Sequence, residues 1–149
     1  MTEGDLRGEA LDTGDGRPDG RQLAEISTTM VRLQKEFFGK GPTKARTSWA
    51  GDDALICLMG GGFTPVEQTL YEAGREDAVQ AMRQAFQMAM KGRLTTAIEN
   101  IVERKVVGFM STSHQDPDVS CEIFLLEPLP DDGDSPLHAE NQRSPGVET

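Results

Sequence analysis

The chain has 149 residues, of which 36% are apolar, and it carries a formal net charge of −10 at pH 7. The length predicts one domain, and the negative charge disfavours unspecific binding to DNA or to anionic lipid. No apolar run approaches the ~20 residues that span a bilayer, and the acidic N-terminus lacks the apolar stretch of a signal peptide. We therefore expect a cytoplasmic protein without a transmembrane segment.

The negative charge is concentrated at the two ends of the chain. Residues 1–20 hold six acidic and two basic side chains, and residues 130–149 hold five acidic and one basic side chain. Each end therefore has a net charge of −4, which leaves −2 for residues 21–129. Both ends are rich in Gly, Pro, Asp and Ser, and they cannot bury enough apolar surface to offset the entropy cost of ordering. We predict disordered acidic tails at 1–20 and 130–149 around one domain at 21–129.

An amphipathic helix is predicted at about residues 21–38, ended by Gly39. Its apolar residues recur at steps of three, four, three and four: Leu23, Ile26, Met30, Leu33 and Phe37. The same spacing also forms a short heptad seam, which in a homodimer would be shared between two subunits. We favour a stripe that packs on the protein's own sheet, and keep self-association through this seam as the alternative.

A first β-hairpin is predicted after the helix. Residues 44–50 alternate in polarity, Gly51-Asp52-Asp53 forms a turn, and residues 54–59 form a more apolar strand that ends at the glycines 60–62. Cys57 and Cys121 both lie in apolar runs, which suits buried free thiols better than a disulfide.

Two helices are predicted next. Thr64 and Glu67 have capping-box spacing, and Pro65 suits the first helical position of a short helix that reaches Ala73. A longer helix begins near Arg75. Its apolar positions stay in phase across Gly92: Val79, Met82, Phe86, Met90, Leu94, Ile98 and Ile101.

A second hairpin is predicted at the end of the domain, with strands at about 105–111 and 119–127 around the turn signal Asp116-Pro117-Asp118. The element order is α-ββ-αα-ββ, with hairpins in place of crossovers. It predicts a single two-layer α+β domain, in which a four-stranded, largely antiparallel sheet has its helices on one face.

A basic rim at residues 35–46 is the candidate anion site, with Lys40, Gly41, Lys44 and Arg46 as its residues. Glycines beside lysines can present amides and charge to a phosphate, but the P-loop pattern is absent. A structural turn with solvated lysines is the favoured interpretation. Binding of a phosphate-containing ligand or nucleic acid is the alternative, and nucleic acid is disfavoured because no aromatic residues are interleaved with the basic ones.

No catalytic or metal-binding constellation stands out in the sequence. His114, Asp116 and Asp118 are candidate metal ligands by type, but the core has one histidine and Asp-Pro-Asp is common turn chemistry. No nucleophile or orienting partner accompanies His114. We expect a protein that is not an enzyme and that uses no cofactor or metal.

The core resembles the MpsC-like family, a bacterial domain family named for a Na+-translocating, membrane-potential-generating system. The motifs that carry the resemblance lie in order at residues 39–42, 63–70, 104–109, 114–118 and 124–128. The chain departs from the family pattern at the glycines 60–62. The resemblance implies a soluble accessory of a membrane transport system and supplies no catalytic residues. With the seam above, it predicts a cytoplasmic interaction protein that self-associates and contacts transport subunits.

Overall fold

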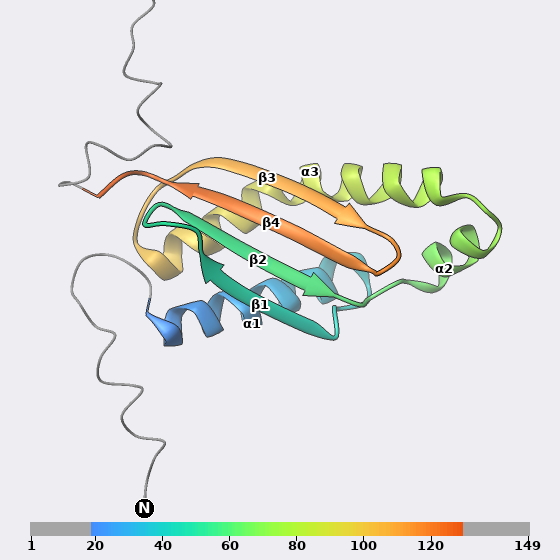
Figure 1. The fold of residues 1–149 in the computed structure, drawn as a ribbon, viewed down its shortest axis with the longest axis horizontal. Coiled ribbons are helices and arrows are strands. Elements are labelled where there is room, and N and C mark those ends of the chain that lie inside the picture. The colour runs from blue at the N-terminus through green and yellow to red at the C-terminus, as the bar shows by residue number, and fades with distance from the viewer. Residues whose placement is uncertain (1–18, 130–149) are drawn as a thin grey trace, which may run out of the picture.

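The computed structural model describes residues 19–129, which form four strands and three helices (Figure 1). The predicted tails lie outside this range, apart from Asp19 and Gly20. Gly20 is the first residue of helix α1 (Gly20–Phe38), which begins slightly earlier than expected, and Asp19 is its N-cap residue. Asp19 accepts a hydrogen bond from the backbone of Gln22, and the Gln22 side chain accepts one from the backbone of Asp19. This capping box satisfies amides that the helix itself leaves free.

The four strands form one antiparallel sheet in the order β1-β2-β4-β3. One hairpin consists of β1 (Lys44–Trp49) and β2 (Ala54–Gly60), and the other of β3 (Val106–His114) and β4 (Val119–Leu126). Pairing of β2 with β4 joins the two hairpins, so β1 and β3 are the edge strands. The predicted α+β fold, with its order α-ββ-αα-ββ and antiparallel sheet, is confirmed.

Strand β3 is longer than predicted, because it continues from residue 111 to His114. The polar segment Ser111-Thr112-Ser113 resembles a loop in composition, but each of its residues pairs with a residue of β4. The turn itself is confined to residues 115–118. Tertiary pairing here outweighs local composition.

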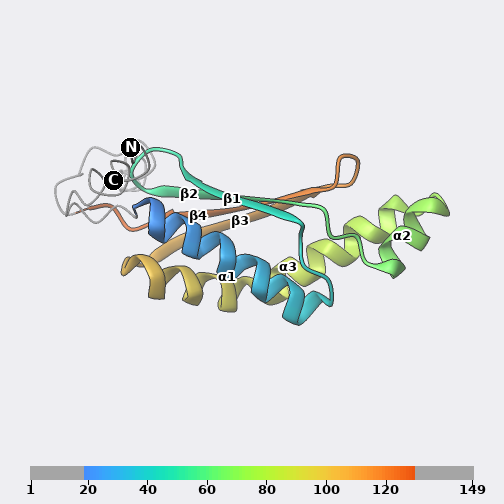
Figure 2. The same cartoon turned by 90° about the horizontal axis from the view of Figure 1, so that it is seen from below.

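Both long helices lie on the same face of the sheet (Figure 2). Helix α1 packs on β1 and on α3 (Glu76–Val102), and α3 packs on β3. The short helix α2 (Pro65–Glu72) lies beyond the end of the sheet, against α3. As predicted, Gly92 does not interrupt α3. The core lies between the helices and the covered face of the sheet, and its most buried side chains include Ile26, Met30, Leu55, Ile98, Phe124 and Leu126.

The backbone conformation explains why glycines follow β2. Gly61 and Gly62 adopt φ angles of 77° and 109°, in the region that only glycine enters readily. A Cβ on Gly61 would also lie 2.5 Å from Oγ1 of Thr43. The glycines therefore form a specific bend at the sheet end, where Gly61 donates a backbone hydrogen bond to Asp118.

Candidate functional site

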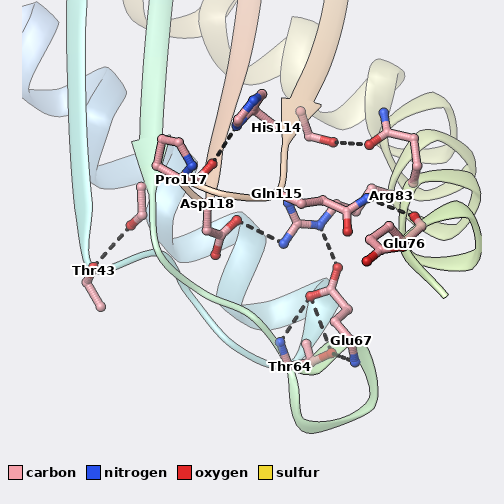
Figure 3. A network of polar contacts seen from close by, with 12 residues as sticks. Thr43, Thr64, Glu67, Glu76, Arg83, His114, Gln115, Pro117 and Asp118 are labelled. Carbon is pink, nitrogen blue, oxygen red and sulfur yellow. Dashed lines mark hydrogen bonds and ion pairs between the residues drawn. The ribbon is translucent and has the colours of Figure 1, made fainter. Parts of the chain in front are cut away.

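A buried ionic cluster joins α2, α3 and the β3–β4 turn (Figure 3). Arg83 of α3 is 7% exposed, and its Nε lies 2.6 Å from Oε2 of Glu67. Its Nη2 lies 2.9 Å from Oδ1 of Asp118. The guanidinium also lies over the ring of Phe63, 4.6 Å from the centroid. Burial alone would lower the pKa of Arg83, but the two carboxylates outweigh burial and raise the pKa above its ordinary value. Arg83 therefore stays charged and connects α3 with α2 and with the β3–β4 turn.

Glu67 has two roles in this cluster. Its Oε1 accepts a hydrogen bond from the backbone of Thr64 at 3.0 Å, as the predicted capping box requires, and its Oε2 accepts from Arg83. The capping role is readable from the spacing of Thr64 and Glu67. The pairing with Arg83 is not, because it depends on how α2 folds back on α3.

A small cavity of about 30 Å³ lies next to the cluster, towards the sheet. Its lining includes Arg83, Gln87, Asp118 and Glu122. Glu122 is 2% exposed, and within residues 19–129 its Oε2 has no hydrogen-bond partner, nor has Oδ2 of Asp118. Burial raises the pKa of Glu122 to about 7, with a smaller opposing effect from the hydroxyl of Ser111. The cavity has room for about one water molecule.

The β3–β4 turn is tied to the helices by further contacts. The Gln115 side chain donates to the carbonyl of Glu76 at 2.8 Å, and Tyr71 donates to Asp116 at 3.4 Å. Nδ1 of His114 lies 2.9 Å from the carbonyl oxygen of Pro117, within the turn (Figure 3). Within residues 19–129 no three His, Cys, Asp or Glu side chains are grouped so that they could hold a metal ion. Residues 115–118 form the turn that the Asp116-Pro117-Asp118 signal predicts, and Asp118 has the added role of binding Arg83.

The predicted anion-site residues are not brought into one site. Lys40 follows α1 and lines the cavity, on the helix side of the sheet. Lys44 and Arg46 lie two residues apart on β1, opposite Gly60 and Leu58, so they share the uncovered face. Gly41 packs against α1, where an added Cβ would lie 3.1 Å from Cβ of Lys35. This close packing supports the structural interpretation of the glycine.

The helical seam proposed for self-association belongs mainly to the core. Ile26, Met30 and Leu33 are 0%, 1% and 8% exposed and pack in the core cluster, and Leu23 packs against it. Phe37 is 41% exposed, and its ring lies under the guanidinium of Arg93. The interpretation of a stripe packed on the protein's own sheet is therefore correct for this helix. The seam as a whole is not available to a second subunit in this fold, because its central side chains contact the sheet.

Within residues 19–129 no helix lies over the second face of the sheet (Figure 2). The register of the strands places a row of apolar side chains on this uncovered face: Ile56, Leu58, Met110, Ile123 and Leu125. Met110 is 51% exposed. Among the strand residues of this face no Asp or Glu occurs, whereas Lys44 and Arg46 border it on β1. The uncovered face is thus apolar with a basic margin.

Sequence reasoning missed the ionic cluster, although a signal for it exists. Arg83 and Gln87 occupy inward positions of α3, in phase with Val79, Met90 and Leu94, and both are buried. Glu122 likewise lies in an otherwise apolar strand. A polar residue at a core position requires a buried partner, and this rule points to all three side chains.

Comparison with known protein families supplies one match. Residues 19–128 match the family described as the Na+-translocating membrane potential-generating system (MpsC). No curated protein and no solved structure matches the chain. No helix within residues 19–129 has the length and apolar character needed to cross a membrane. Because the match covers all seven helices and strands of the domain, the chain belongs to the MpsC family.

Proposed function

We propose that this chain is a non-enzymatic cytoplasmic interaction protein that docks, through its uncovered sheet face, on a subunit of a membrane transport system. The observation that carries the proposal is the apolar row on that face, which includes Leu58 and Ile123. In the part of the chain that the structure describes, no helix lies over this row. Antiparallel sheets with one free face usually present polar side chains there. A contiguous apolar surface marks an interaction site.

The charges at the face indicate the chemistry of the partner. Lys44 and Arg46 border the apolar row, and the strand residues of this face contain no acidic side chain. Complementary potentials favour a partner segment that combines apolar and acidic residues. The family description supplies the link to a Na+-translocating system. The partner we propose is a cytoplasmic segment of such a system with this mixed character.

Affinity capture from membranes of the native host tests the proposal. The test variant carries Leu58→Thr and Ile123→Thr, which remove apolar surface and place β-branched residues that suit a strand at both positions. The control is Val66→Thr on α2, where the apolar side chain is 61% exposed and lies away from the sheet. We expect the wild type and the control to retain transport subunits, and the double variant to lose them. Equal recovery by all three proteins, or recovery of nucleic-acid-handling proteins alone, would contradict the proposal.

Binding of a phosphate-containing ligand through the basic rim is the weaker candidate. Lys40 lies on the helix side of the sheet, whereas Lys44 and Arg46 lie on the uncovered face. These placements favour the docking function over the anion-binding function.

A further inference from the structure

The two edge strands of the sheet differ in how they are protected. Charged side chains on an edge strand discourage pairing with another chain. Strand β1 carries Lys44 and Arg46, whereas β3 has no charged residue from Val106 to Ser113. In an edge strand every second residue directs its peptide N–H and C=O away from the sheet. The β3 edge is therefore the one suited to accept a further strand.

A groove of about 200 Å³ runs beside this edge, between β3 and α3. Lys91, Thr95 and Glu99 line it from the helix, and residues 106–109 line it from the strand. Glu99 accepts a hydrogen bond from the backbone of Val106 at 3.0 Å. Within residues 19–129 the ammonium group of Lys91 makes no ion pair. Met88 is 64% exposed, and its spacing of seven and eleven residues from Thr95 and Glu99 places it on the same flank of the helix.

The charges on this flank are self-complementary. Lys91, Thr95 and Glu99 are four residues apart, so they lie one above the other along α3. A two-fold axis beside Thr95 would place two copies of α3 side by side and antiparallel. Lys91 of one copy would then face the partner's Glu99, twice in the dimer. The same axis would also make the two β3 strands antiparallel, an orientation in which edge strands can pair.

We propose that the β3 edge and the α3 flank beside it form a two-fold interface with a second copy of this chain, with antiparallel β3 strands and reciprocal Lys91–Glu99 pairs. The interface would join the two sheets into one of eight strands and leave the uncovered faces open. It is separate from the docking function, because it uses the edge of the sheet and not the face.

Sedimentation equilibrium of the full chain at 1 to 100 µM tests this interface. We expect a dimer that Lys91→Glu weakens by about tenfold, because two attractive pairs become repulsive. The exchange variant, Lys91→Glu with Glu99→Lys, restores the charge complementarity but removes the hydrogen bond from Val106 to Glu99, so it should recover part of the affinity. Glu25→Lys, an exposed charge reversal on α1, is the control and should leave the affinity unchanged.

Three outcomes of the sedimentation experiment would overturn the interface. These are a monomer at 100 µM, a dimer that Lys91→Glu leaves intact, and a weakened dimer that the exchange variant does not restore. Hydrogen exchange provides a second measurement, in which amides of β3 should gain protection as protein concentration rises. The Leu58→Thr, Ile123→Thr variant should still dimerise, so failure of docking and failure of dimerisation are distinguishable. Protection of β3 only after another protein is added would also contradict the self-pairing.

Discussion

Arg83 and Glu67 form an ion pair of 2.6 Å in which the two side chains are 8% and 0% exposed. The pair joins two helices that are separated by a tight turn, and Asp118 extends it to the β3–β4 turn. One guanidinium thus fixes how the α2–α3 unit sits at the end of the sheet. Buried ion pairs contribute little compared with well-packed apolar residues, but removal of one partner leaves an uncompensated charge.

We expect Glu67→Leu to lower the free energy of unfolding by about 3–5 kcal/mol, because Arg83 then loses its Oε2 partner in a buried site. The loss of the capping oxygen adds to this cost. Urea denaturation measures the change. The control is Glu72→Leu, at the exposed end of α2, which should cost less than about 1 kcal/mol. Equal effects of the two substitutions would show that the buried pair has no special role.

Glu122 should make stability depend on pH near neutrality. Its folded-state pKa is about 7 against an ordinary value of 4.5, so the folded protein binds the proton more tightly than the unfolded chain. The stabilisation is complete below pH 4.5 and is lost as the pH rises through 7, by up to about 3 kcal/mol. Glu122→Gln removes this dependence and should be more stable than the wild type at pH 8.

The measurement is the difference in unfolding free energy between wild type and Glu122→Gln from pH 4.5 to 8.5, because other carboxyl groups titrate equally in both proteins. A matched control is Glu127→Gln, an exposed residue just after β4. A difference that stays constant over this pH range would contradict the raised pKa of Glu122.

The two thiols should react at very different rates. Burial raises the pKa of Cys57 to about 11, and it raises the pKa of the less buried Cys121 in the same direction. At pH 8 about one in a thousand Cys57 thiols is ionised, and only the thiolate attacks a disulfide reagent. We expect an aromatic disulfide to modify Cys121 first and Cys57 only on unfolding. Cys121→Ser should therefore leave a native protein that is almost unreactive, and equal rates for both thiols would contradict the buried position of Cys57.

Much of the fold was predictable because its signals are local. The capping box of Thr64 and Glu67, the glycine end of α1 at Gly39 and the unbroken phase of α3 each depend on residues within a few turns of one another. The hairpins follow from short alternating segments around turns. Strand β3 was predicted too short because Ser111–Ser113 are ordered by β4 and not by their own propensity.

The candidate sites depend on contacts between residues far apart in the chain. Arg83 and Asp118 are separated by 35 residues, and nothing local to either position pairs them. Ile26 and Leu33 show the opposite case, since one spacing fits both a helix packed on its own sheet and a seam between subunits. Periodicity reports that a side chain is buried, but not what buries it.

The family, the order of the helices and strands, and their antiparallel arrangement could be inferred from the amino-acid sequence, because hydrophobic period, caps and turns are properties of neighbouring residues. The three-dimensional fold was needed to see which face of the sheet the helices cover, where Lys40 and Arg46 lie relative to each other, and which uncharged edge strand lies beside a groove. These features arise when separate segments pack together, so they depend on the three-dimensional arrangement of the chain and not on any one stretch of it.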